Sequence, residues 1–275
     1  MDATWEGTQL SDEADVWELY HENSKVTRYL NFPSEPVILS KMASMYESLP
    51  YEGYATFPLP EHHGAIDQGV DALMTMRKSA RSLARTLMRL DQVAAILRLG
   101  YGITRINDSS AYPRSFRTVP SGGALYPLEL YLYAGDVEDL SGLYHFNAKN
   151  NTLSLLRPGD QTAALRQCFV QSDLPDRASV LVFITAIFER TVFKYGARGY
   201  RFAMIEAGHV AQNINLCSVS MGLGCLNIGG FYDHDIDNYL GLDGIGHSTI
   251  YAVAIGKDRD GADSSRSDTN EHDRQ

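Results

Sequence analysis

Two apolar, β-branched runs constrain the fold of this chain most strongly: Ser179–Phe188 (SVLVFITAIF) and Thr249–Ile255 (TIYAVAI). Neither run alternates with polar residues, so each is predicted to be a central strand buried on both faces. Between them, Phe202–Leu223 carries small and apolar residues at helical spacing. Gly222 and Gly224 end that segment in the way that helix C-termini prefer. The pattern predicts a buried sheet with a long helix whose neighbours can approach closely.

Shorter segments complete this prediction. Leu128–Ala134 alternates as a strand does, and Leu143–Phe146 and Leu153–Leu156 flank NAKNN as the two arms of a hairpin. Ser82–Tyr101 has leucines close to helical spacing and is predicted to form one or two helices. Strands kept apart from long helices, and no GxGxxG after a strand, favour an α+β fold over a doubly wound sheet.

The chain divides into an N-terminal region, a body and a tail. A helix is predicted over residues 11–31, and residues 32–70 hold most of the prolines and are expected to form an irregular arm, so residues 1–70 make one region. The body runs from 71 to 256, and with 44% hydrophobic residues overall the chain can bury a real core. Residues 257–275 are polar, charged and without periodicity, and we expect disorder there.

Charge and cysteine usage exclude several functions. The formal net charge of −10 argues against nucleic acid or an anionic membrane as the main partner. The three cysteines, Cys168, Cys217 and Cys225, show neither a disulfide framework nor metal-ligand spacing, so no metal is expected. The N-terminus lacks the features of a signal peptide, and no apolar run reaches membrane-spanning length. We therefore expect a cytoplasmic protein.

The segment Lys194–Arg201 (KYGARGYR) gathers the most reactive side chains of the chain. A lysine beside a tyrosine near a pocket can donate or accept a proton near neutral pH, which makes Lys194 and Tyr195 candidate catalytic residues. Arg198 and Arg201 suit an anionic ligand. A solvated basic loop is the alternative interpretation of the same cluster.

A second motif, Arg77–Arg81 (RKSAR), is predicted to enter the first helix of the body. Ser79 can cap that helix, and Arg77, Lys78 and Arg81 surround its N-terminus. Unpaired backbone N–H groups and basic side chains together favour a phosphate site. A solvated helix start explains these five residues equally well.

A third motif, Pro120–Pro127 (PSGGALYP), sets two adjacent glycines between prolines. Bare backbone of this kind permits a sharp turn or the close approach of another group, such as a flat ring. A plain turn alone does not predict the flanking Ser121 and Tyr126, or the tyrosine-rich strand that follows.

In this order, RKSAR, YGITR, PSGGALYP, KYGARGYR, EAGHVAQN and GLGCLNIGGF resemble the FMN-dependent nitroreductase superfamily. More narrowly, they resemble its SagB-type branch, the azoline oxidases (dehydrogenases) of peptide natural-product pathways. The resemblance covers about Asp71 to Gly256. YHENSK at Tyr20–Lys25 also resembles the N-terminal arm of that branch.

The resemblance implies a sandwich of a mainly antiparallel sheet with flanking helices, and a homodimer with FMN at its interface. Arg77 and Ser79 would hold the phosphate, Ser121–Gly123 would face the flavin of the partner chain, and Gly229 and Gly230 would lie near its N5. The FMN-binding residues implied in this way are Arg77, Lys78, Ser79, Arg81, Pro120, Ser121, Gly122, Gly123, Ile228, Gly229, Gly230, Lys257 and Arg259.

This chain departs from the superfamily at two points. Lys257 and Arg259 are its match to a Lys-x-Arg pair that often completes the phosphate site, yet they begin an acidic tail. Gly229 stands where simple nitroreductases often carry an acidic residue, which favours an oxidase over an enzyme that docks a nicotinamide.

The implied reaction is dehydrogenation of an azoline-type ring, with a hydride passing to flavin N5 and a proton to Lys194 and Tyr195. Oxygen would reoxidise the flavin. Tyr126, Arg198 and Arg201 are the candidate substrate contacts. Two alternatives stay open, an NAD(P)H-dependent nitro or quinone reductase and a non-catalytic subunit of a biosynthetic complex. The substrate can be a small molecule, a peptide or a carrier-bound intermediate.

Overall fold

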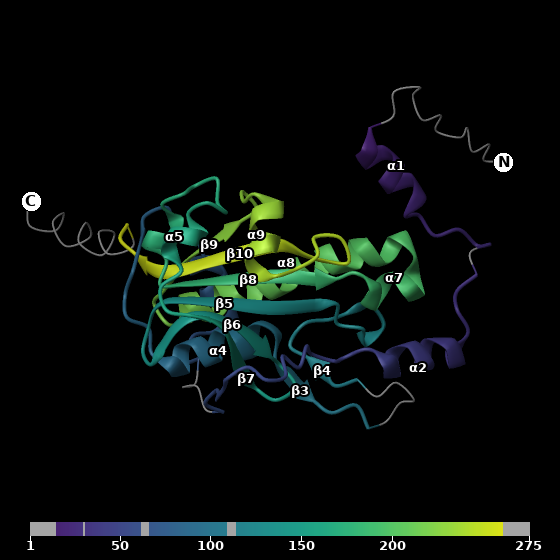
Figure 1. The fold of residues 1–275 in the computed structure, drawn as a ribbon, viewed down its shortest axis with the longest axis horizontal. Coiled ribbons are helices and arrows are strands. Elements are labelled where there is room, and N and C mark those ends of the chain that lie inside the picture. The colour runs from purple at the N-terminus through teal and green to yellow at the C-terminus, as the bar shows by residue number, and fades with distance from the viewer. Residues whose placement is uncertain (1–14, 30, 62–65, 109–113, 261–275) are drawn as a thin grey trace, which may run out of the picture.

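The structure, a computed structural model, describes residues 15–29, 31–61, 66–108 and 114–260. Within these ranges an eight-stranded sheet is covered by helices on both faces (Figure 1). Its strands are β1 (Thr56–Pro58), β2 (Leu83–Ala84), β5 (Leu128–Val137), β6 (Leu140–Asn147), β7 (Thr152–Pro158), β8 (Val180–Ile187), β9 (Gly224–Ile228) and β10 (His247–Asp258). A separate two-stranded ladder joins β3 (Ile103–Arg105) to β4 (Phe116–Arg117).

The strands of the large sheet pair in the order β1-β7-β6-β5-β8-β10-β2, and β9 also pairs with β10. Each of these ladders is antiparallel. Successive side chains of a strand point to opposite faces, so Leu130 and Leu132 of β5 enter one core cluster while Tyr131 and Tyr133 enter the other. A strand that is apolar on both faces belongs in the middle of the sheet, which is where β5 and β8 lie.

Two helical layers cover the sheet. The long helices α4 and α8 pack on the face that carries Leu130, and α5, α6 and α9 cover the face that carries Tyr131. Figure 1 shows α2 and α7 beyond one end of the sheet and α5 at the other end. The helices are α1 (Val16–Asn23), α2 (Glu35–Ser44), α3 (Val70–Met76), α4 (Leu90–Tyr101), the 3-10 turn η1 (Gly122–Ala124), α5 (Thr162–Leu165), α6 (Leu174–Arg177), α7 (Glu189–Tyr195), α8 (Ala197–Ser220) and α9 (Asp233–Leu240).

The α+β fold, with a mainly antiparallel sheet and flanking helices, is confirmed. The two apolar runs form β8 and β10, and the β6–β7 hairpin forms where the sequence predicts it. The predicted long helix is α8, but it begins at Ala197, five residues earlier than expected. Arg198 and Arg201 therefore lie on a helix and not in a loop.

Several segments differ from the predictions. The arm contains α2, because Ser34 precedes it and Pro36 occupies its first turn, where proline fits. Residues 82–89 are not helical, since Leu83 and Ala84 pair with the end of β10. That pairing extends β10 to Asp258, past the predicted start of the tail, and residues 261–275 lie outside the described residues.

The N-terminal helix is shorter than predicted. It spans α1, and the chain is not helical over 25–29, while residues 1–14 and 30 lie outside the described part of the chain. The division of the chain at residues 70 and 256 stays a prediction.

Candidate active site

Lys194 and Tyr195 are the last two residues of α7, and Gly196 (φ 56°) turns the chain into α8. The Lys194 Nζ lies 5.1 Å from the centroid of the Tyr195 ring. Both side chains reach the same backbone, because a Cβ placed on Gly123 would lie 2.6 Å from the Tyr195 Oη and 2.9 Å from the Lys194 Nζ. The predicted catalytic pair therefore converges on the PSGGALYP motif of its own chain.

The PSGGALYP loop has a strained backbone. Gly123, Ala124 and Tyr126 have φ values of 66°, 53° and 46°. The left-handed region is rare for residues other than glycine, and such strain gathers at functional sites. Ser121 stabilises the loop, since its Oγ accepts a hydrogen bond of 2.9 Å from the Tyr126 N–H. A plain turn would not need three such residues.

The four predicted FMN-binding residues of this loop, Pro120–Gly123, lie together, and Pro120 and Gly123 are exposed. Gly122 is pressed against the Phe202 ring, since a Cβ there would lie 2.9 Å from that ring. Phe202 also packs edge-on against Tyr195, with ring centroids 5.0 Å apart. The loop and the Lys194–Tyr195 pair thus both pack against Phe202.

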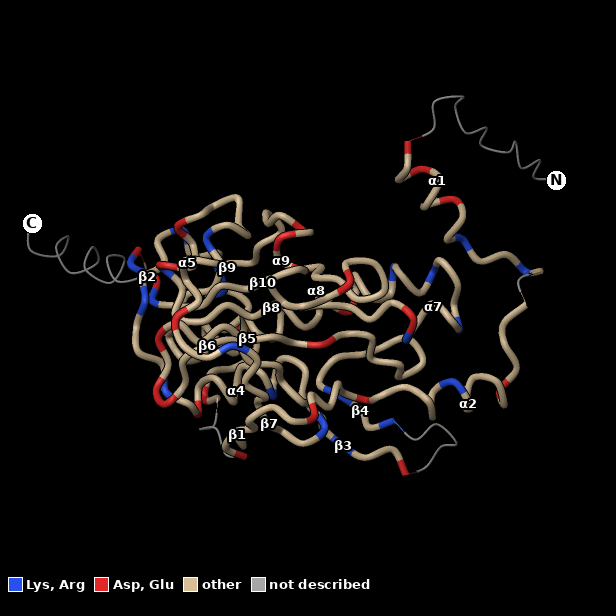
Figure 2. Tube along the Cα trace, in the orientation of Figure 1, with Lys and Arg blue, Asp and Glu red and all other residues tan. Residues whose placement is uncertain are grey.

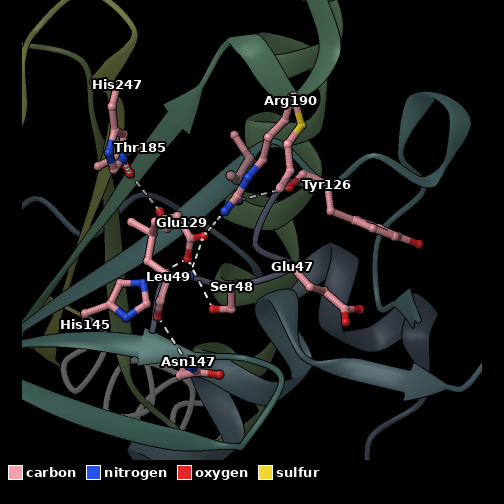
Figure 3. A network of polar contacts seen from close by, with 12 residues as sticks. Glu47, Ser48, Leu49, Tyr126, Glu129, His145, Asn147, Thr185, Arg190 and His247 are labelled. Carbon is pink, nitrogen blue, oxygen red and sulfur yellow. Dashed lines mark hydrogen bonds and ion pairs between the residues drawn. The ribbon is translucent and has the colours of Figure 1, made fainter. Parts of the chain in front are cut away.

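A buried ion pair joins α7 to β5. Arg190 donates to the Glu129 Oε1 at 2.6 Å, and both side chains are almost fully buried. His145 donates to the Glu129 Oε2 at 2.8 Å, and the Leu49 N–H donates to the Oε1 at 3.1 Å (Figure 3). Burial alone would raise the pKa of the Glu129 carboxyl, but the Arg190 charge and the His145 hydrogen bond hold it well below its ordinary value.

A second buried carboxyl lies behind the loop. Glu206 of α8 is 2% exposed and accepts a hydrogen bond of 2.7 Å from the Tyr101 hydroxyl at its Oε1. Its Oε2 is buried without a hydrogen-bond partner among the described residues. Burial, offset only in part by Ser121, Tyr101 and Arg117, raises the pKa of Glu206 to about 7.

Tyr126, a predicted substrate contact, lies in the core instead. It is 4% exposed, and its hydroxyl accepts a hydrogen bond of 3.1 Å from the Arg117 N–H. Its ring packs edge-on against Tyr101. The structure differs from the prediction because the motif places an aromatic residue near two glycines but does not show into which side of the loop its ring turns.

Arg198 and Arg201 both form hydrogen bonds with the N-terminal arm. Arg198 Nε donates to the Ser24 carbonyl at 2.7 Å, and an Arg201 amino group donates to the His21 carbonyl at 2.8 Å. These carbonyls end α1, where cations are favoured by the helix dipole. Both arginines thus contact a segment 174 or more residues away in sequence, and their substrate role stays a prediction.

The arm forms one side of a pocket above the catalytic pair. The pocket measures about 280 Å³ and lies between Lys194, Tyr195 and Arg198 of the body and residues 23–26 and 31–33 of the arm. Phe32 contacts the Tyr195 ring edge-on, with centroids 6.3 Å apart. The arm therefore limits what can reach the Lys194–Tyr195 pair.

The RKSAR motif lies far from that pocket, beside β9. Ser79 forms an isolated bridge with Cys225, and the Ala80 N–H donates to the Cys225 carbonyl at 2.9 Å. Ser79 caps no helix, because α3 ends before the motif and α4 begins only at Leu90. The prediction that a helix begins at this motif is wrong. The motif can therefore contact a phosphate through its side chains but not through a helix N-terminus.

Those side chains line a pocket of about 440 Å³ formed by Arg77, Lys78, Ser79, Arg81, Asp258 and Asp260. Lys78 forms an ion pair of 3.1 Å with Asp258. Lys257 and Arg259 flank that aspartate, and Lys257 lines an adjoining pocket of about 330 Å³. Figure 2 shows basic residues gathered near β2, with acidic residues among them.

Ile228, Gly229 and Gly230 lie at the end of β9, whereas the RKSAR segment lies beside Cys225, near the start of that strand. Ile228 is buried opposite Ala252 of β10, and both glycines are exposed. A Cβ on Gly229 would meet nothing within 4 Å, so its backbone is open to a flat ligand. These three residues thus lie three or more residues farther along β9 than the point where the RKSAR segment meets that strand.

Most of the predicted site residues form two groups in one chain. The loop and the Lys194–Tyr195 pair lie beyond Leu128, at one end of β5, whereas Lys257 lies beyond Ile255, which is level with Ala134. Six residues of strand separate Leu128 from Ala134, which corresponds to about 20 Å. The predicted phosphate residues and the Lys194–Tyr195 pair therefore lie at opposite ends of the sheet.

Sequence reasoning missed Arg190 and Glu129, which lie 61 residues apart and carry no motif. It also missed Asp258 and Asp260 as lining residues of the basic pocket. No cluster of three metal-ligating side chains occurs among the described residues. No helix in the part of the chain that the structure describes has the length and apolarity needed to cross a membrane.

Comparison with known families matches residues 74–257 to the nitroreductase family. "Putative nitroreductase MJ1384" of Methanocaldococcus jannaschii is 35% identical over 62% of this chain and 83% of its own length. Microcin B17-processing protein McbC of Escherichia coli and trifolitoxin-processing protein TfxB of Rhizobium leguminosarum are each 30% identical. This chain spans 52% of McbC and 39% of TfxB.

Solved structures show the same fold. A nitroreductase-like protein from Anabaena variabilis superposes with a TM-score of 0.69 at 20% identity, over 88% of this chain and 47% of that chain. The microcin synthetase McbBCD complex of E. coli, with truncated pro-MccB17 bound, gives a TM-score of 0.55 at 19% identity. That match covers 82% of this chain and 94% of the other.

Gly123→Ala should destabilise the protein by about 1 to 3 kcal/mol, because a positive φ strains alanine and its Cβ must displace the ends of the Tyr195 and Lys194 side chains. Urea unfolding measures the loss. Gly159→Ala is the matched control, since Gly159 also has a positive φ but open space around it. Equal losses in the two variants would contradict the close approach at Gly123.

Glu206→Gln should change how stability depends on pH. Because the pKa of Glu206 is raised from 4.5 to about 7 in the folded state, wild-type stability falls as pH rises through that range and stays low above it. The glutamine variant lacks this fall and should gain about 2 to 3 kcal/mol on wild type between pH 5 and pH 8. Urea unfolding at both pH values tests this, with exposed Glu138→Gln as control. Parallel pH profiles for Glu206→Gln and wild type would refute the raised pKa.

Proposed function

The chain belongs to the nitroreductase family, and from this premise we propose that it is an FMN-dependent oxidoreductase of the SagB type. The resemblance to the superfamily is confirmed, and the relatives McbC and TfxB support its SagB-type branch. In the proposed reaction an azoline-type ring, or a related natural-product intermediate, loses two hydrogen atoms. The observation that carries this proposal is the convergence of Lys194 and Tyr195 on Gly123.

The residues at the basic pocket fit the phosphate of FMN. Arg77, Lys78 and Arg81 supply positive charge to a pocket of about 440 Å³, and the Ser79 hydroxyl can donate to a phosphate oxygen. The exposed, uncrowded backbone at Gly229 and Gly230 leaves room for a flat ring. Bound FMN would supply a hydride acceptor that oxygen regenerates.

The Lys194–Tyr195 pair would take the proton that leaves the ring carbon of the substrate. The Tyr195 hydroxyl and the Lys194 ammonium lie near one point of the loop backbone, so either group, or both together, can serve as the base. The arm and Phe32 would exclude water from this point and orient the substrate. Chemistry at one bond requires that proton and hydride leave neighbouring atoms, so the pair must lie close to the flavin ring.

This requirement supports a homodimer. In one chain the phosphate residues and the Lys194–Tyr195 pair lie at opposite ends of the sheet, about 20 Å apart by strand rise. A second copy would bring its own loop and its own pair to the flavin held by the first. Because Gly123 contacts the pair, the Pro120–Gly123 loop and the pair must come from the same chain.

The family name alone also fits a reductase that uses NAD(P)H, and the relative MJ1384 carries that name. The retained Lys194–Tyr195 pair and the arm above it favour the oxidase. Stopped-flow mixing with NADPH separates the two functions, since rapid bleaching of the flavin would support the reductase. A purified protein without flavin would support a non-catalytic subunit.

The substrate class remains open within this proposal, and it includes a small molecule, a peptide or a carrier-bound intermediate. McbC and TfxB are named as the processing proteins of microcin B17 and trifolitoxin, and the first probe we choose is a thiazoline-containing peptide. We expect the reaction to occur in the cytoplasm. Mass spectrometry of the probe should detect a loss of two hydrogen atoms.

Tyr195→Phe should retain FMN and lower turnover of the probe about 100-fold or more, because a positioned acid–base group is removed. Flavin absorbance measures occupancy, and mass spectrometry measures turnover. Tyr200→Phe is the matched control, since Tyr200 belongs to the same motif but packs against Tyr20 and Phe188. Retained turnover in Tyr195→Phe would overturn its catalytic assignment.

A shared site should allow two inactive variants to complement one another. Arg77→Ala/Arg81→Ala should lose FMN, and Tyr195→Phe should lose turnover. When the two are co-expressed, half of the dimers are mixed and each has one intact site, so about a quarter of wild-type activity should return. If each chain instead holds a complete site, the mixture stays inactive.

A further inference from the structure

Arg190 occupies the first turn of α7, four residues before Lys194. Residues four apart lie on the same side of a helix, one turn apart. Its side chain is 3% exposed and turns inward to Glu129 at the start of β5. The end of α7 that carries the proposed catalytic pair is thus one helical turn from a buried anchor.

The anchor itself is fixed from several sides. Glu129 accepts hydrogen bonds from His145 of β6, from the Leu49 N–H and from the Ser48 hydroxyl at 3.3 Å. The carboxylate therefore joins β5, β6, α7 and the segment that precedes β1. A carboxylate with this many donors has little freedom to move, so the guanidinium that pairs with it is fixed as well.

Arg190 also reaches the strained loop. Its second amino group donates to the Tyr126 carbonyl at 3.4 Å, and Tyr126 has a φ of 46° (Figure 3). A backbone in such a conformation persists only where its surroundings hold it. One side chain consequently touches both parts of the site, the helix with Lys194 and Tyr195 and the loop with Gly123.

We propose that Arg190 is a positioning residue whose guanidinium, held by Glu129, sets the geometry in which Lys194 and Tyr195 meet the Gly123 loop. The expected effect of Arg190 on turnover rests on the proposed function, whereas its expected effect on the geometry of the pair does not. Only arginine has the planar fork that can bond a carboxylate and a carbonyl in fixed directions. A lysine here would keep the charge, but its single ammonium group could not bond Glu129 and the Tyr126 carbonyl in the same fixed directions.

Arg190→Lys should keep FMN and lower kcat per bound flavin about 100-fold, with KM within about threefold of wild type, because misplacement by about 1 Å is enough for such a loss. The Cζ resonance of Tyr195 in protein labelled with [ζ-13C]tyrosine should shift, and Tyr195→Phe identifies that resonance. This second measurement needs no substrate, so it distinguishes a failure of this proposal from a failure of the proposed function.

Arg85→Lys is the matched control. Arg85 also donates to several groups, Thr162, Pro175 and Ala178, but lies beside Gly135, at the opposite end of β5. This variant should leave kcat per bound flavin and the Tyr195 resonance unchanged. Glu129→Gln should act in the same direction as Arg190→Lys and replaces it if that variant does not fold. An unshifted Tyr195 resonance in the folded variant would overturn the proposal, as would a loss of kcat equal to that of Arg85→Lys.

Discussion

The buried Glu129–Arg190 ion pair is the interaction on which the rest of the candidate site depends. Taking two charges out of water is costly, and the cost is offset only where further hydrogen bonds satisfy them. His145, Leu49 and Ser48 provide those bonds to Glu129. The pair therefore requires several elements to be in place together. The helix α7 has only seven residues and would not be stable alone, and the ion pair explains how it is held at the site.

Most of the sheet could be predicted from the sequence because its information is local. The runs that become β8 and β10 are apolar throughout, and the β6–β7 hairpin is marked by its loop. The short helices could not be predicted in this way. Seven residues of α7 between a strand and a long helix show too little periodicity, and β2 forms only because β10 is beside it.

In the candidate site, too, contacts between neighbours in the sequence could be predicted, and contacts between distant residues could not. Lys194 and Tyr195 are adjacent in the sequence, so their proximity could be predicted without a structure. The interaction of Arg198 with Ser24 spans 174 residues, and that of Arg190 with Glu129 spans 61. In both cases the sequence shows an arginine but not its partner. That is why two arginines expected at a ligand hold the arm, and why the arginine that reaches the loop was missed.

The acidic residues in the basic pocket are compatible with a phosphate there. The Lys78 side chain is 57% exposed, so its ion pair with Asp258 contributes at most about 1 kcal/mol. A phosphate dianion can form stronger, charge-assisted hydrogen bonds with Arg77 and Arg81, and it attracts Lys78 as well. Asp258 therefore opposes the phosphate only weakly. The Asp258 side chain, 12% exposed at the end of β10, attracts Lys78 toward the same pocket.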